Sequence, residues 1–186
     1  MPATRSRISG GEARGIPIAE PRGLRLRPTS SLVREAVFNI LGERVVGAAV
    51  ADLFAGTGAL GIEALSRGAS RATFVDSEAA ACQAILQTLS RTGFQDRARV
   101  LRGKLPAALA SLDGPFDLVF LDPPYQEPVG PEILVEVERY LAPDGLVVYE
   151  HGSRYNPPGR PGGLHLLDRR TYGDSAIALY ATQEGQ

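Results

Sequence analysis

From about residue 50 onward, the chain alternates short apolar runs with helical patterns. This alternation restricts the fold more than any other feature of the sequence. The apolar runs lie at 50–54, 72–75, 98–101, 117–121 and 145–149, and the helical patterns at about 59–67, 78–92, 104–111 and 130–141. Runs that are apolar on both faces are typical of strands in a parallel sheet that helices cover on both sides. With 186 residues, 44% of them hydrophobic, the chain is long enough for one such α/β domain.

The alternation ends after residue 151, where the loop-like stretch "RYNPPGRPGG" follows. The next stretch, "LHLLDRRTYGDSAIALYA", predicts two strands that turn near Gly173 without a helix between them. Because strands joined by a short turn run antiparallel, we expect a hairpin at one edge of a mostly parallel, Rossmann-like sheet.

Residues 1–42 precede the alternation and are predicted to form a small N-terminal extension to the main domain at 43–186. The stretch "RISGGEARGIPIAEPRGLRLRPTSS" predicts a small hairpin or an extended arm. The stretch "SSLVREAVFNILG" predicts a helix, with Ser30 or Ser31 as its N-cap and Gly42 at its end.

Positive charge gathers in the extension, although the whole chain has a net charge of only −1. Residues 1–34 hold seven arginines against Glu12 and Glu20, a local charge of +5, so the remaining residues carry −6. A GC-rich genome explains a high arginine content, but it does not explain why arginines crowd one end. Because guanidinium groups suit phosphate contacts, we expect RNA contact through this segment. The residues expected to make it are Arg5, Arg7, Arg14, Arg25, Arg27 and Arg34.

A glycine-rich turn follows the first apolar run in "VADLFAGTGALGIEAL". Gly56, Gly58 and Gly61 form a G-x-G-x-x-G pattern between a strand and a helix, and Asp76 ends the next predicted strand. This pattern is typical of a nucleotide-binding turn with an acid for ribose hydroxyls. Asp52, which precedes the glycines, would repel the pyrophosphate of NAD. It would suit S-adenosylmethionine, which has a ribose, an ammonium group and a sulfonium but no phosphate.

The fourth apolar run ends in "FLDPPYQ", where two prolines stop the strand. This stretch could be no more than a strand terminator. After a glycine turn at the first strand, however, it indicates a clamp for a planar amine. The Asp122 carboxylate and the Pro123 carbonyl would accept the two N–H groups, and Tyr125 would stack on the base. The sulfonium already activates the methyl group, so the protein mainly has to supply position and electrostatics.

Four stretches of the chain together resemble the RsmD family, bacterial enzymes that methylate guanine N2 in 16S ribosomal RNA. They are "RPTSSLVREAVFNIL", "DLFAGTGALGIEALSRGA", "FLDPPY" and "YGDSAIALY". The resemblance implies a class I S-adenosylmethionine-dependent methyltransferase fold with seven strands and an N-terminal extension that touches RNA. It also implies a base flipped out of the RNA into the site.

The resemblance also implies a role for individual residues. Those matching the cofactor site are Asp52, Phe54, Ala55, Gly56, Gly58, Asp76 and Ser77. Those matching the catalytic clamp are Asp122, Pro123 and Tyr125. One departure is visible after the third strand, where related enzymes often have an acid or amide near the adenine and this chain has Gly103 and Lys104. Glu150 and His151 end the fifth strand, and their role stays open between structure and catalysis.

Other functions would use the same motifs differently. An amine methyltransferase acting on adenine N6 in DNA or RNA would need the same clamp, although a DNA enzyme would be expected to carry a large target-recognition insert. An NAD-dependent oxidoreductase would leave "DPPY" unexplained, and a catalytically silent RNA-binding module would not need the clamp.

The remaining expectations concern partners and location. Cys82 is the only cysteine, so neither an intrachain disulfide nor a four-cysteine zinc site can form, and we expect no metal. The apolar window at 45–65 contains Asp52 and Glu63, so it is interpreted as a strand, turn and helix rather than a membrane span. We expect a cytoplasmic monomer whose partner is ribosomal RNA or a small-subunit assembly particle.

Overall fold

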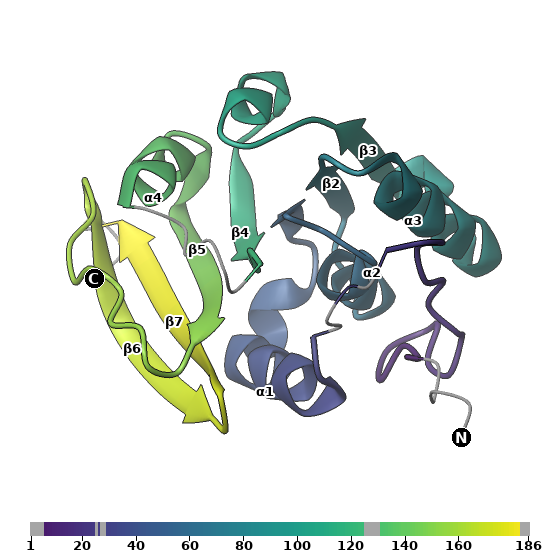
Figure 1. Ribbon diagram of the computed structural model, residues 1–186, viewed down its shortest axis with the longest axis horizontal. Coiled ribbons are helices and arrows are strands. Elements are labelled where there is room, and N and C mark those ends of the chain that lie inside the picture. Colours follow the sequence, from purple (N-terminus) through teal and green to yellow (C-terminus); the bar gives the residue numbers. More distant parts are fainter. Residues whose placement is uncertain (1–5, 25, 27–28, 125–130, 183–186) are drawn as a thin grey trace.

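The computed structural model describes residues 6–24, 26, 29–124 and 131–182. The chain forms a seven-stranded sheet with the order β3-β2-β1-β4-β5-β7-β6 (Figure 1). The strands are β1 Ala49–Leu53, β2 Arg71–Asp76, β3 Ala98–Arg102, β4 Phe116–Leu121, β5 Leu141–Gly152, β6 Leu164–Tyr172 and β7 Ser175–Thr182. Strands β1 to β5 all pair in parallel, and β7 pairs antiparallel with both of its neighbours, β5 and β6. The predicted α/β architecture and the C-terminal hairpin are therefore confirmed, with Gly173 at a positive φ of 60° in the turn.

Helices and short 3-10 turns connect these strands. They are α1 Ser31–Leu41, η1 Gly42–Val45, α2 Ala59–Ser66, α3 Ala79–Thr92, η2 Gln95–Arg97, η3 Ala107–Ser111 and α4 Pro131–Glu138. Ser30 caps α1, because its side chain accepts a hydrogen bond from the Val33 amide, and Gly42 ends the helix as predicted. The helical pattern at 104–111 yields only η3, which begins after Pro106.

The apolar side chains form two cores, one on each face of the sheet. The first packs the N-terminal segment, α1, α2 and α3 against the sheet, and the second packs η3 and α4 against the opposite face (Figure 1). Strand β1 is buried along its whole length, as expected for a strand covered on both sides. None of the helices in the described ranges is both long and apolar enough to cross a bilayer.

The N-terminal segment forms a small hairpin that packs against the first core. Arg7 and Pro17 form an antiparallel bridge, and the amides of Ile8 and Ile18 donate to the carbonyls of Ile16 and Ser6. Ile8, Ala13 and Ile18 are buried in the core that also contains α2 and α3. The division of the chain at residue 42 into an extension and a main domain stays a prediction.

Candidate active site

The sheet order gathers the polar strand ends of the sequence at one edge. Strands β1 and β4 are parallel neighbours, and the chain continues from β1 toward β2 on one side and from β4 toward β5 on the other. Ligands of open α/β sheets bind beyond the carboxyl ends of the strands where the order reverses in this way. Asp52, Asp76 and Asp122 all lie at this rim, as do Glu150 and His151 at the end of β5.

The turn after β1 is held in an unusual backbone conformation. Phe54, Gly56 and Gly58 have φ angles of 58°, 58° and 74°. Only Phe54 bears a side chain there, and such strained residues cluster at ligand sites. The amide of Gly56 donates to Asp76 Oδ2 at 2.8 Å, and the amide of Glu78 donates to Asp76 Oδ1 at 2.9 Å. The predicted cofactor turn and the predicted ribose acid are thus in direct contact.

Gly61, the third glycine of the pattern, serves packing. A Cβ atom at this position would overlap the ring of Phe74 on β2, so only glycine lets α2 approach the sheet this closely. Its amide donates to Asp52 Oδ2 at 2.9 Å. Asp52 is 2% exposed, and burial raises the pKa of this carboxyl well above its ordinary value, an effect that the charges of Asp122 and Asp76 reinforce and the Gly61 hydrogen bond opposes.

Three carboxyl groups therefore share one rim. Among the described residues, no lysine or arginine forms an ion pair with Asp52, Asp76 or Asp122. Such a site favours a ligand that carries positive charge and disfavours a pyrophosphate. No group of three or more histidine, cysteine or acidic residues in the described ranges is arranged to hold a metal ion.

Asp122 directly follows β4, and a residue of the N-terminal extension holds it. The Thr29 hydroxyl donates to Asp122 Oδ2 at 2.6 Å. Burial raises the pKa of Asp122 to about 6, while the Thr29 hydrogen bond lowers it. Sequence reasoning missed Thr29 as a site residue, although it lies within the motif "RPTSSLVREAVFNIL". Tyr125 lies outside the described residues.

The remaining residues predicted to bind the cofactor lie in less specific positions. Ala55 donates its amide to the Val75 carbonyl at 3.0 Å and so ties the turn to β2. Ser77 is exposed beyond β2, and its carbonyl accepts from Arg102 Nε at 3.4 Å. The amide of Gly103 donates to the Asp76 carbonyl at 2.9 Å, so the point of departure from the family pattern lies beside the predicted ribose acid.

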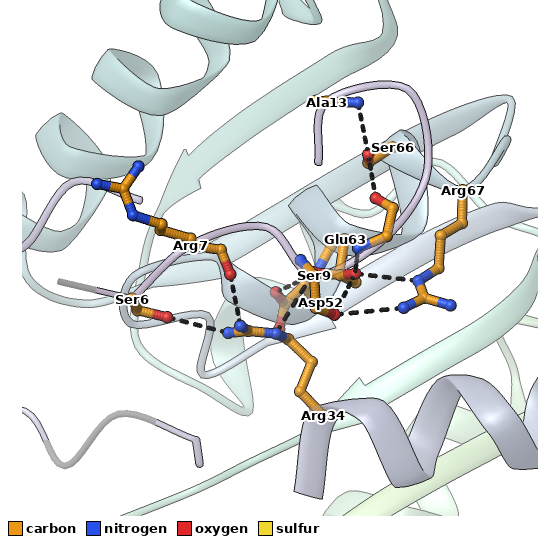
Figure 2. Close-up of polar contacts among 11 residues, drawn as sticks. Ser6, Arg7, Ser9, Ala13, Arg34, Asp52, Glu63, Ser66 and Arg67 are labelled. Carbon is orange, nitrogen blue, oxygen red and sulfur yellow. Dashed lines mark hydrogen bonds and ion pairs between the residues drawn. The ribbon is translucent and has the colours of Figure 1, made fainter. Parts of the chain in front are cut away.

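The predicted RNA-contacting arginines that the structure describes differ in their exposure. Arg7 and Arg14 are exposed, whereas Arg5, Arg25 and Arg27 lie outside the described residues. The prediction for Arg34 is wrong, because this side chain is 1% exposed and its Nε lies 3.4 Å from Glu63 Oε2 (Figure 2). Its Nη2 also donates to the Arg7 carbonyl at 2.7 Å. Arg34 fastens the extension to α2 and is not available to a phosphate.

Glu63 is the centre of this buried cluster (Figure 2). Its side chain is 0% exposed and also accepts from Arg67 Nε at 3.0 Å. The Ser9 amide and hydroxyl donate to it at 2.9 and 2.7 Å, and the Gly10 amide donates at 2.8 Å. The extension is therefore attached to α2, the helix that follows the glycine turn.

Comparison with known proteins agrees with this arrangement. The chain matches the model of the family described as conserved hypothetical protein 95 over residues 6–181. It is 36% identical to ribosomal RNA small subunit methyltransferase D of Escherichia coli strain K12 over 94% of this chain and 88% of that protein. It is also 36% identical to YlbH of Bacillus subtilis strain 168, over 94% of this chain and 97% of that protein.

Comparison with solved structures gives the same result for the fold. The solved structure of the Escherichia coli protein yhhF superposes with a TM-score of 0.85 at 34% identity, covering 97% of this chain and 99% of that one. The chain therefore belongs to the conserved hypothetical protein 95 family, the RsmD family of methyltransferases that its motifs predicted.

Proposed function

We propose that the protein transfers a methyl group from S-adenosylmethionine to the exocyclic N2 amine of a guanine in 16S ribosomal RNA. The observation that carries this proposal is the position of Asp122. Its carboxylate follows β4, the strand that pairs with β1, and so lies beside the glycine turn. The name of the Escherichia coli relative supports ribosomal RNA of the small subunit as the substrate.

The residues at the rim fit S-adenosylmethionine. Each oxygen of Asp76 already accepts one backbone amide and keeps a second lone pair, which suits it to the ribose hydroxyls. The three carboxyl groups form no ion pair with a basic side chain of the described residues, and they suit the ammonium and sulfonium charges. Residues 54–58 would line the methionine and ribose. Bound S-adenosylmethionine supplies a methyl group that its sulfonium has already activated for transfer.

The chain's own contribution is to orient the amine. The lone pair of an amine on a base is delocalised into the ring, so the nitrogen must be drawn toward a tetrahedral geometry before it attacks. An Asp122 oxygen and the Pro123 carbonyl would accept its two N–H groups. The negative charge of Asp122 would also stabilise the positive charge that develops on the nitrogen. Thr29 fixes the carboxylate, so little reorganisation is needed during the reaction.

The exposed arginines Arg7 and Arg14 would contact phosphates of the RNA, and the target base would be flipped into the site. The substrate is ribosomal RNA or an assembling small subunit, so we expect the reaction to occur in the cytoplasm.

Nucleoside mass spectrometry of 16S ribosomal RNA from a deletion strain tests the proposal. We expect the loss of one N2-methylguanosine, which a plasmid copy of the wild-type gene restores and an Asp122→Ala copy does not. Unchanged N2-methylguanosine would contradict the proposal, and loss of N6-methyladenosine would favour the adenine enzyme instead. Calorimetry with purified protein should detect binding of S-adenosylmethionine but not of NAD.

A further inference from the structure

A cavity of about 310 Å³ adjoins the amine clamp on the side of β5. Its lining consists of Pro123 and Pro124, the end of β5 from Tyr149 to Gly152, the loop at 153–155, and Asp174. Three of the lining residues carry aromatic rings, with the His151 ring centroid 5.1 Å from that of Tyr149 and 5.6 Å from that of Tyr155. The lining combines these rings and the two prolines with polar and charged residues, among them Glu150, Arg154 and Asp174, and such a combination suits a flat heterocycle with polar edges.

The sheet register brings His151 next to the clamp. Leu121 on β4 pairs with Tyr149 on β5 in a parallel register. This pair is the last of the ladder, and Pro123 and His151, each two residues farther along its chain, both line the cavity. A base whose amine is bound by the Pro123 carbonyl could therefore extend into the cavity that His151 lines.

The hydrogen bonds of His151 fix which ring nitrogen carries the proton. Nδ1 lies 2.8 Å from the Gly152 carbonyl oxygen, which can only accept, so Nδ1 must be the donor. In the neutral ring Nε2 is then an acceptor. This atom is buried and has no hydrogen-bond partner within the part of the chain that the structure describes. Buried polar atoms are almost always paired, so an unpaired acceptor in a residue that lines a cavity indicates a missing donor.

The surroundings keep His151 neutral. Burial lowers the pKa of His151, and the positive charge of Arg169 lowers it further, against the opposing hydrogen bond to Gly152. Arg169 is held in place because its Nη2 donates to the carbonyls of Ser153 and Tyr155 at 2.6 and 3.2 Å. The loop that forms the cavity wall thus also fixes the charge that keeps Nε2 unprotonated.

We propose that His151 Nε2 accepts the N1–H of the target guanine and so determines the specificity of this site for guanine over adenine. The inference rests on the proposed function. In guanine the N1–H donor is the ring atom next to the carbon that bears N2. In adenine N1 is an acceptor, so two lone pairs would face each other beside the clamp. The clamp alone fits the amine of either base, so the hydrogen bond to His151 would be what distinguishes guanine from adenine.

A cycle of two substrates and three enzymes tests this assignment. The substrates are RNA oligonucleotides that contain guanine or 2-aminopurine at the nucleotide mapped by the deletion strain. 2-Aminopurine keeps the amine but lacks N1–H. The enzymes are the wild type, His151→Phe, which keeps a ring against Tyr149 and Tyr155, and His151→Gln, which restores an acceptor. Calorimetry with S-adenosylmethionine checks that each variant is folded.

We expect the wild type to prefer guanine over 2-aminopurine in kcat/KM, and His151→Phe to reduce this preference roughly 10- to 100-fold. His151→Gln should recover much of it. An equal preference in the wild type and in His151→Phe would overturn the inference while leaving the proposed function intact. If the wild type failed to methylate the guanine oligonucleotide at all, the proposed function itself would fail.

A measurement on the wild type does not depend on the folding of variants. The chain has two histidines, so the ¹⁵N signals of His151 can be assigned by comparison with a His165→Gln variant. We expect an unprotonated Nε2 whose signal shifts when the guanine oligonucleotide is added and stays in place with 2-aminopurine. An Nε2 that is protonated in the free protein, or that shifts equally with both, would overturn the inference.

Discussion

The Thr29 hydroxyl lies 2.6 Å from Asp122 Oδ2, which links a residue just before α1 to the carboxylate just after β4. This distance is typical of a hydrogen bond from a hydroxyl to a charged oxygen. The same segment carries Arg34, which fastens the extension to Glu63 on α2. The N-terminal extension therefore does more than present positive charge, because it also orients the group proposed to act on the substrate amine.

We expect Thr29→Val to lower the single-turnover methylation rate about tenfold, because the substitution removes a hydrogen bond to a charged group. Since Thr29 lowers the pKa of Asp122, the substitution should raise that pKa above about 6 and move the acidic limb of the pH–rate profile to higher pH. Thr29→Ser keeps the hydroxyl and serves as the control. Identical profiles for the wild type and Thr29→Val would show that this hydrogen bond does not orient the catalytic group.

Protonation of Asp122 should itself limit the reaction in acid. Burial raises its pKa to about 6, so the carboxylate is charged above this pH and gains a proton below it. The wild-type rate should fall as the pH drops through 6, and the profile of Asp122→Asn should be flat in that range. Asp122→Ala should lower the single-turnover rate by about 10²–10³ with cofactor affinity nearly unchanged. If Asp122→Ala kept a near-normal rate, the amine-clamp interpretation would be contradicted, and the "DPPY" stretch would serve only to end the strand.

Local patterns predicted most of the fold because buried parallel strands and capped helices leave direct traces in the sequence. The run at 50–54 became β1 Ala49–Leu53, and the turn predicted near Gly173 separates β6 from β7. The pattern at 104–111 was less reliable, because Pro106 lies inside it and only the short η3 forms beyond that residue.

Interactions between distant residues were not predictable in the same way. From the sequence, Arg34 was indistinguishable from the other arginines of a basic segment. No neighbouring residue indicated that Glu63 would be its buried partner. Thr29 and Asp122 are 93 positions apart, and a threonine before a helix is ordinarily a capping candidate. The acceptor state of His151 depends on the Gly152 carbonyl and on Arg169 from β6, which only the folded chain brings together.

The buried cluster around Glu63 should contribute strongly to stability. Glu63→Ala would leave Arg34, which is 1% exposed, without its carboxylate and the amides of Ser9 and Gly10 without their acceptor. We expect the free energy of unfolding in urea to fall by about 3–5 kcal/mol, because an uncompensated charge stays buried. The control is Glu12→Ala, because Glu12 pairs with Arg97 but is 62% exposed, and it should cost less than about 1 kcal/mol. Equal effects of the two substitutions would contradict the role of the cluster.

The final prediction separates phosphate binding from attachment within the same extension. Arg7 and Arg14 are exposed, so their guanidinium groups can reach RNA without breaking the buried cluster. Changing both to alanine should weaken RNA binding, because fewer counterions are released when the complex forms. The slope of log affinity against log salt should fall by up to about 0.7–0.9 for each arginine that binds a phosphate. Arg139→Ala is the matched control, since Arg139 is 70% exposed and directly follows α4, across the sheet from the extension.

Affinity for S-adenosylmethionine, measured by calorimetry, should be unchanged in all of these variants. A salt slope that stayed at the wild-type value would mean that the exposed arginines are only solvated. A weakened cofactor affinity would mean instead that the extension closes over the cofactor site, since Thr29 already connects it to Asp122 at the same rim.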